Sequence, residues 1–254
     1  MNLFLFAHQD DEYGVYPILE QIVARGDVVK VIYLTSGTLD GSLSERRNRE
    51  STGVLSRIGI ADTDIHFLGA DLHFPDGKLF QHVEPAAQAV SALFQDAGTP
   101  TRIFSPAWEG GHQDHDATYI IACYLAQMFS CLEASRQFPL YNGQGLPGSC
   151  WHTFMPLPEN GPVESFKLSW RARLRYLRLC LHYRSQWPTW LGLYPMYALR
   201  LCTSGRQFLQ PLRTDRLNSA PHPGQSLYER RGFCDRKEFG YHTGALIDKI
   251  TRYS

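Results

Sequence analysis

The chain lacks the features that would place it in several common classes of protein. Its 25 Lys and Arg residues balance 25 Asp and Glu residues, so the net charge gives no general case for nucleic-acid binding. No uninterrupted apolar stretch reaches transmembrane length, and no charged segment followed by an apolar one opens the chain. The sequence therefore predicts neither a membrane span nor a secretion signal.

Cysteine is sparse and absent from the first 120 residues. The six cysteines show no Cys-x-x-Cys spacing. This spacing argues against a thiolate zinc site and against a dense disulfide framework. Free thiols in the cytoplasm are the simplest explanation, so we expect a cytoplasmic protein.

The two parts of the chain differ in charge although the whole is neutral. Residues 1–120 carry 8 Lys and Arg against 17 Asp and Glu, which leaves 17 against 8 for the remainder. The acidic part suits a cation, and the basic part suits an anionic substrate or a lipid surface. The alternative is that the two parts pair with each other.

Apolar runs and turn signals alternate regularly through the first half of the chain. They predict strands at 2–6, 28–34, 64–68 and 102–104, and helices at 15–24, 44–58, 83–97 and about 116–135. This alternation predicts an α/β fold, a Rossmann-like parallel sheet with helices on both faces. No Gly-x-Gly-x-x-Gly follows the first strand, so the usual dinucleotide-binding fingerprint is missing.

The pattern weakens after residue 136, where we expect a C-terminal cap or extension. Residues 137–148 resemble a loop, 151–155 a short strand, and 166–183 a basic amphipathic helix. In that helix Trp170, Leu174, Leu177 and Leu181 share one face, and Arg171, Arg175 and Arg178 share another. Residues 187–201 are aromatic and contain two prolines, which leaves three interpretations: a substrate-side cap, core packing or a membrane-surface element.

A cluster of ionisable residues follows the first predicted strand directly. The run Ala7-His8-Gln9-Asp10-Asp11-Glu12 holds one imidazole and three carboxylates within five residues. Adjacent carboxylates repel one another, and a buried unpaired carboxylate is costly, so the cluster needs either solvent or a cation. It is therefore either a divalent-metal site or a solvated acidic turn that caps the next helix.

A second group of ligand-type side chains follows the fourth predicted strand. His112 and His115 lie three residues apart, with Asp114 between them. Because the carboxyl ends of parallel strands meet at one edge of a sheet, we expect them to lie beside His8 and Asp11. Two His and one Asp leave a fourth position for water, which is the pattern of a catalytic zinc site.

These two motifs resemble the AHPDDE and HPDH signatures of the PIG-L/LmbE-like deacetylases. Further matches follow in order at residues 47–59, 75–79 and 183–186: Arg47-x-x-Glu50 in a helix that ends at Gly59, Pro75-Asp76-Gly77-x-Leu79, and Tyr183-x-Ser185-Gln186. The resemblance extends over about residues 2–186. It implies a zinc-dependent N-deacetylase that removes an acetyl group from an N-acetylglucosamine-like sugar or sugar conjugate, with Fe²⁺ as an alternative metal.

The resemblance also implies a role for each matching residue. By position, the metal ligands are His8, Asp11 and His115; the general base is Asp10; the general acid is His112; Arg47 and Asp76 contact the substrate; Glu12 and Asp114 are supporting residues. An adjacent Asp114 or Asp116 is expected to hold the His112 imidazole in its charged form. Residues 1–136 would then form the metal-binding catalytic region, and 137–254 would complete the fold within one continuous domain.

This chain departs from the family pattern at three positions. Gln9 and Gln113 each replace a proline, and Gly110 lies where some members carry an oxyanion-stabilising Tyr. None of these changes removes a ligand. The expected partner is a small-molecule or glycoconjugate substrate, anionic if the Arg face contacts it. Two alternatives are a deacylase of a non-sugar N-acyl metabolite and a non-catalytic metal- or carbohydrate-binding protein.

Overall fold

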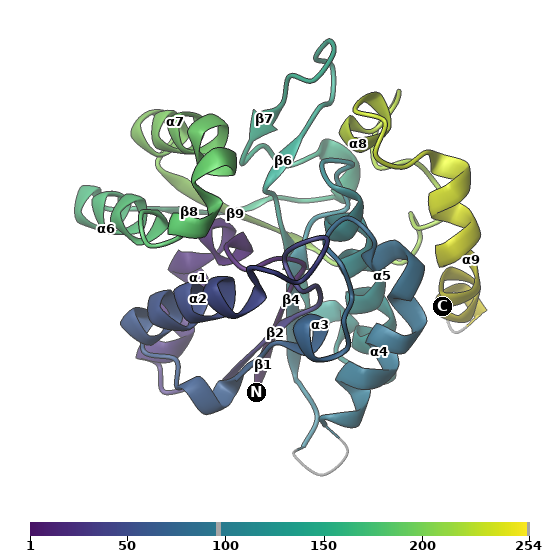
Figure 1. The fold of residues 1–254 in the computed structure, drawn as a ribbon, viewed down its shortest axis with the longest axis horizontal. Coiled ribbons are helices and arrows are strands. Elements are labelled where there is room, and N and C mark those ends of the chain that lie inside the picture. Colours follow the sequence, from purple (N-terminus) through teal and green to yellow (C-terminus); the bar gives the residue numbers. More distant parts are fainter. Residues whose placement is uncertain (95–97, 253–254) are drawn as a thin grey trace.

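A seven-stranded sheet runs through the centre of the computed structural model, which describes residues 1–94 and 98–252 (Figure 1). The strand order is β3-β2-β1-β4-β5-β9-β8. The strands are β1 (Asn2–Phe6), β2 (Val29–Tyr33), β3 (Ile65–His66), β4 (Arg102–Pro106), β5 (Arg136–Phe138), β8 (Glu164–Lys167) and β9 (Arg206–Pro211). The first five are parallel, whereas β9 and β8 add an antiparallel edge. A separate antiparallel pair is formed by β6 (Tyr141–Asn142) and β7 (His152–Thr153).

Helices cover both faces of this sheet. They are α1 (Tyr16–Ala24), α2 (Ser44–Ile58), α3 (Leu68–Asp71), α4 (Val83–Ala92), α5 (Gln113–Met128), α6 (Trp170–Cys180), α7 (Trp187–Thr203), α8 (Leu227–Arg230) and α9 (Arg236–Arg252). Side chains of α4, α5 and α9 share one apolar core, and those of α1, α2, α6 and α7 share the other. The predicted α/β class is therefore confirmed.

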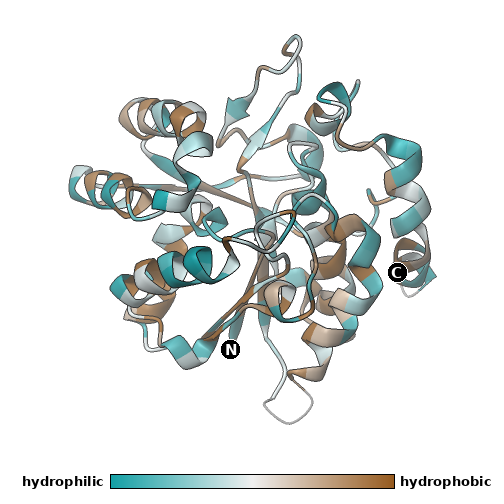
Figure 2. Ribbon diagram, in the orientation of Figure 1, coloured by the Kyte–Doolittle hydropathy of each residue, from teal (hydrophilic) through white to brown (hydrophobic). Residues whose placement is uncertain are grey.

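Strand β1 explains why the sheet has two cores. Successive side chains of a strand point to opposite faces, so Leu3 and Leu5 enter the core under α5 while Phe4 and Phe6 enter the core under α1. All five residues of β1 are buried, as expected for a central parallel strand. Figure 2 shows the same arrangement, with apolar strands at the centre and hydrophilic turns on the outer helices.

Several predicted elements have different bounds in the structure. The helix expected at about 116–135 begins at Gln113 and ends at Met128. The expected loop at 137–148 is wrong in part, because β5 pairs with β4 and buries Phe138. The basic helix begins only at Trp170, since Glu164–Lys167 pair with β9. Helix α4 ends at Ala92, and the last part of its predicted range, 95–97, lies outside the described residues.

The aromatic segment that the sequence left open is one continuous helix, α7. Pro188 lies in its first turn, where a missing N–H is tolerated, and Pro195 lies inside it. One face of α7 packs into the core through Trp190, Leu193 and Tyr197. Among the described residues, no helix combines the length and apolar character that crossing a bilayer requires.

Candidate metal centre

The two ligand-bearing loops meet where the strand order reverses. β1 lies between β2 and β4, so the chain leaves β1 towards one side of the sheet and later returns on the other. Clefts at the carboxyl ends of the strands form at such points. Residues 7–12 follow β1, and residues 107–112 follow β4. The structure brings them together: the His8 and His112 rings lie 4.7 Å apart.

His8, Asp11 and His115 form a compact buried group. Each offers one ligand atom, and these atoms lie within 4.8 Å of one another. The Asp11 carboxylate lies between the two imidazoles: Oδ1 is 3.0 Å from His115 Nε2, and Oδ2 is 3.5 Å from His8 Nδ1. The backbone N–H of His8 also donates to Asp11 Oδ2 at 2.8 Å, which fixes the carboxylate. These are the three residues that the sequence predicted as ligands.

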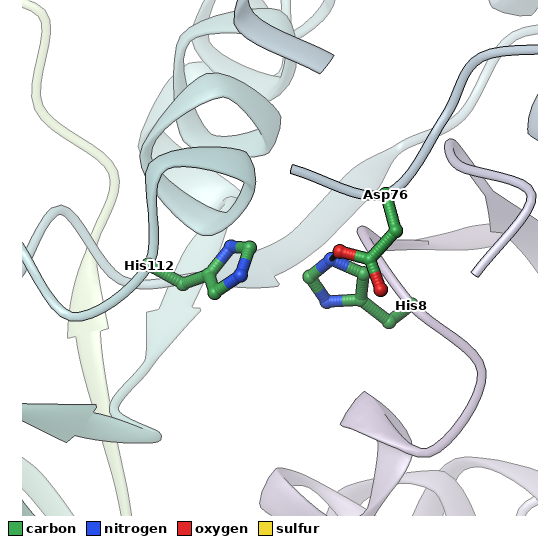
Figure 3. Close-up of side chains that lie close together, drawn as sticks. All are labelled: His8, Asp76 and His112. Carbon is green, nitrogen blue, oxygen red and sulfur yellow. Dashed lines mark ion pairs between the residues drawn. The ribbon is translucent and has the colours of Figure 1, made fainter. Parts of the chain in front are cut away.

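A second possible ligand group shares His8 with the first. His8, Asp76 and His112 point towards one another in Figure 3, and their ligand atoms also lie within 4.8 Å. His8 Nε2 is 3.1 Å from Asp76 Oδ1. The sequence assigned Asp76 to substrate contact, so this proximity to His8 is a finding of the structure. His8 therefore belongs to both possible ligand groups.

The donor set fits a divalent ion of the zinc or iron type. Imidazole and carboxylate together suit these metals, and the cluster has no thiolate. His115 is buried and its Nδ1 has no hydrogen-bond partner among the described residues, so this ring keeps one ring nitrogen uncommitted. Burial disfavours the Asp11 carboxylate, yet His115 and His8 outweigh burial and hold the Asp11 pKa well below its usual value. Asp11 is thus ionised, as a metal ligand must be.

Asp10 lies beside the group but points to a different partner. Its backbone has φ of 125°, a left-handed conformation that is rare for a residue with a side chain. The Asp10 N–H donates to Glu12 Oε2 at 3.0 Å, and Arg47 Nη2 lies 3.2 Å from Asp10 Oδ1. Burial raises the Asp10 pKa to about 8 despite Arg47. A strained, buried acid with a raised pKa is the kind of group found at catalytic sites.

His112 precedes helix α5 directly and is held by that helix. Its Nδ1 accepts the backbone N–H of Asp114 at 3.1 Å, so the ring proton lies on Nε2. Burial and the charge of His8 lower the His112 pKa to about 4, outweighing Asp114. The expectation that Asp114 or Asp116 keeps His112 charged is therefore wrong. The Asp116 carboxylate accepts the N–H groups of Glu109 and Gly110 instead.

The two predicted substrate contacts are engaged with the protein itself. Arg47 is only 4% exposed; its Nη2 donates to the Gln9 carbonyl at 2.7 Å and its Nη1 donates to the Gly37 carbonyl. Asp76, which is partly exposed, lies 3.7 Å from Arg47 Nη1. Substrate contact by either residue stays a prediction.

The predicted supporting residues hold the loops of the site. Glu12 accepts the Tyr183 hydroxyl at 2.7 Å as well as the Asp10 N–H, whereas it does not cap α1. Asp114 accepts the N–H groups of Gly77 at 2.6 Å and Leu79 at 2.9 Å, and its Oδ2 lies 3.2 Å from His8 Nε2. Glu12 thus ties the β1 loop to the late Tyr motif, and Asp114 ties the 76–79 turn to α5.

Tyr141 is the site residue that the sequence did not reveal. It follows β5, its ring lies 5.5 Å from that of His115, and burial raises the pKa of its hydroxyl above the usual value. A side chain at Gly111 would collide with the Tyr141 carbonyl, so the two loops are in close contact. The sequence predicted a loop over 137–148 and so did not indicate that Tyr141 lies at the site. Recognising β5 as a strand would have placed Tyr141 there, because β5 ends at the same edge of the sheet.

Fold and site together define an α/β protein with a buried His–Asp–His group, able to hold a divalent ion, at the carboxyl edge of a parallel sheet. Residues 3–125 match the model of the family described as PIG-L: GlcNAc-PI de-N-acetylase. This segment contains His8, Asp11 and His115. The match confirms the resemblance that the motifs predicted over residues 3–125, just under half of the chain. The predicted matches after residue 125 stay predictions.

The fold is shared with solved structures. The zinc-inhibited form of teicoplanin deacetylase superposes with a TM-score of 0.61 at 17% identity, over 83% of this chain and 97% of the other. N,N'-diacetylchitobiose deacetylase from Pyrococcus horikoshii gives 0.58 at 18%, over 84% and 82%. A conserved protein from Thermus thermophilus gives 0.55 at 22%, over 83% and 92%. No curated protein matches the chain by sequence.

Proposed function

We propose that the protein is a metal-dependent amide hydrolase that removes the acetyl group from an N-acetylglucosamine-like sugar or sugar conjugate. The observation that carries this proposal is the buried His8–Asp11–His115 group with Asp10 and His112 beside it. The family match and the deacetylases of the same fold support the reaction class. The names of those deacetylases, which refer to teicoplanin and to N,N'-diacetylchitobiose, support a sugar or glycoconjugate substrate.

His8, Asp11 and His115 would hold the metal, and zinc is our first choice. When bound, such an ion lowers the pKa of water and polarises a carbonyl. Zinc added to metal-free protein at about 100 times its dissociation constant should stabilise the fold by about 2.7 kcal/mol. His115→Ala should abolish this gain in a thermal melt, whereas His182→Ala, just beyond the end of α6, should keep it. Equal stabilisation of both variants would rule out the predicted ligand set.

The remaining residues act on protons and on developing charge. Asp10 takes the proton of the attacking water, a role worth about 10²–10⁴-fold in rate that requires the ionised carboxylate, the form that the neighbouring Arg47 favours. His112 donates a hydrogen bond from Nε2 to the acyl oxygen, because its Nδ1 is used by Asp114. Arg47 keeps the Asp10 carboxylate oriented, and Tyr141 contacts the substrate beside His115. The general-acid role of His112 stays a prediction, since it requires that the ring first takes up a proton.

Acetate release tests the function directly. The purified protein, with its metal content measured, is offered N-acetyl amino sugars, nucleotide sugars, lipid-linked sugars and non-sugar N-acetyl compounds. Release from sugar substrates alone supports the proposal. Release only from non-sugar amides would support the metabolite deacylase, and a metal-loaded protein that releases nothing would support a binding protein.

Two wider expectations belong with this proposal. We propose a cytoplasmic location, which is supported by the six cysteines, all free in the structure. We also propose that the chain is one continuous domain, because β8 and β9 from the C-terminal part extend the sheet that β1–β5 begin. Limited proteolysis that releases a stable fragment at residue 136 would contradict the second.

A further inference from the structure

A long segment of the chain carries positive charge without acidic residues. Residues 165–214 contain no Asp or Glu and nine Lys and Arg. The segment includes α6 and α7, which lie side by side at one edge of the molecule (Figure 1). Within the described residues only two of the nine form ion pairs, Arg175 with Glu20 and Arg213 with Asp215. Arg173 is buried, and five of the others are exposed and available to a partner: Lys167, Arg171, Arg178, Arg184 and Arg206.

Helix α7 exposes apolar side chains over a broad arc of its surface. The exposed fractions are 62% for Trp187, 55% for Leu191, 40% for Met196 and 57% for Leu199. The helix has no charged residue before Arg200, so no charge interrupts this arc. The opposite face of α7 already fills the core. At about 100° per residue these side chains spread over about half of the helix circumference, and a broad exposed apolar face of this kind marks an interaction surface rather than incidental exposure.

The exposed apolar side chains of α6 lie on the side of that helix nearest α7. Two buried or paired arginines orient the helix: Arg173 Nη1 donates to the Leu201 carbonyl of α7 at 3.1 Å, and Arg175 Nη2 donates to the Arg57 carbonyl of α2 at 2.8 Å. Successive residues of a helix are about 100° apart around its axis. Going around α6 from Arg173, which contacts α7, to Arg175, which contacts α2, one first meets the apolar side chains and then the arginines. The apolar ones are Trp170, Leu181 and Leu174, and the arginines are Arg178 and Arg171. The apolar faces of the two helices therefore adjoin, with an arginine row along the α1–α2 side.

We propose that this surface, the exposed face of α6 and α7, docks on an anionic lipid bilayer. Apolar side chains and Trp enter the boundary between headgroups and acyl chains, while Arg side chains contact the phosphates. The α6–α7 face supplies both exposed tryptophans of the described residues, Trp170 and Trp187, beside the arginine row. Figure 2 shows the mixture of apolar and hydrophilic turns on these helices.

A second copy of the chain fits this surface less well. A symmetric dimer places the same patch on both partners, so the arginine rows of two copies would face or flank each other, and Glu20, which lines a pocket with these arginines, is already paired with Arg175. Like charges brought together in an interface are unfavourable. A surface with a high density of phosphate neutralises the same arginines and also receives the apolar faces.

Vesicle co-sedimentation of the full chain tests the proposal. We expect binding to phosphatidylcholine vesicles that contain phosphatidylglycerol, little binding to pure phosphatidylcholine, and weaker binding at high salt. Arg171→Glu with Arg178→Glu should reduce partitioning by at least about tenfold, and so should Trp187→Asp with Leu191→Asp. Matched controls are Arg46→Glu with Arg49→Glu on α2, and Tyr241→Asp on α9, all at exposed positions; these should bind as the wild type does.

Three outcomes would overturn the proposal. They are no preference for anionic vesicles, equal binding by the α6–α7 variants and their controls, and a wild-type dimer in gel filtration that the α6–α7 variants convert to a monomer. Acetate release from a soluble substrate is measured on the same variants, and we expect wild-type rates. A loss of that activity would place α6 and α7 in the catalytic unit instead. Vesicle binding needs no substrate, so it stands or falls separately from the proposed deacetylase function.

Discussion

Asp10 is the residue whose replacement best separates binding from chemistry. Asn has the size of Asp and still offers an oxygen to Arg47 Nη2, but it cannot take a proton. We expect Asp10→Asn to keep the wild-type metal content and to lower kcat by about 10²–10⁴-fold. Asp40→Asn, at an exposed position, is the control. Normal turnover in the Asp10 variant would remove Asp10 as the base.

The two glutamines that replace proline have distinct structural partners. Gln9 Nε2 donates to Asn48 Oδ1 at 2.8 Å, and Gln113 Nε2 donates to the Gly77 carbonyl at 3.2 Å, so each ties a signature loop to a neighbouring element. We expect Gln113→Ala to loosen the turn that carries Asp76, because a net hydrogen bond contributes about 1 kcal/mol. KM should rise severalfold with little change in metal content, and Gln88→Ala, exposed on α4, should change neither. A kcat effect alone would contradict this role.

At the scale of elements, α2 depends on how its C-terminus is closed. Gly59 has φ of 103°, and an added Cβ would lie 3.0 Å from Val23 Cγ1. Gly26 also has a positive φ, but a Cβ there meets nothing within 4 Å. Gly59→Ala should therefore lower the free energy of unfolding by about 1–2 kcal/mol from backbone strain, plus a contact penalty that Gly26→Ala does not have. Urea denaturation of both variants measures the difference, and equal losses would show that the Val23 contact is relieved without cost.

The sequence predicted the elements whose signals are local. The bounds of α2 match the prediction because Gly59 ends the apolar pattern, and β1 matches because a short apolar run precedes the acidic cluster. Helix α5 begins three residues before its predicted start because the His112 side chain caps it, which propensity does not reveal. β5 has only three residues, and its identity as a strand comes from pairing with β4. Because the sequence did not predict β5, it also did not predict that Tyr141, which follows β5, lies at the site.

At the scale of the whole molecule, one buried carboxyl links two parts of the fold. Glu109, in the loop after β4, accepts the N–H groups of Leu140 at 2.7 Å and Tyr141 at 2.9 Å, and it is fully buried. Burial raises the Glu109 pKa to about 8, against an ordinary value of 4.5, and these hydrogen bonds only partly oppose burial. The folded protein therefore keeps the Glu109 proton over a pH range in which the unfolded chain has lost it.

This difference predicts how stability changes with pH. Below pH 4.5 both the folded and the unfolded state hold the Glu109 proton, and between pH 4.5 and about 8 only the folded state holds it. The free energy of unfolding therefore falls as pH rises through this range, by up to about 1.4 kcal/mol per pH unit. Above about pH 8 neither state holds the proton, and this contribution no longer changes. Gln in place of Glu109 keeps an acceptor for Leu140 and Tyr141 but does not ionise. The Glu109→Gln variant should gain stability relative to the wild type as pH rises from 5 to 8 in urea denaturation. If the free energies of unfolding of the two proteins changed with pH in parallel, the Glu109 pKa would be the same in the folded and unfolded states. The hydrogen bonds from Leu140 and Tyr141 would then be accepted by a charged carboxylate.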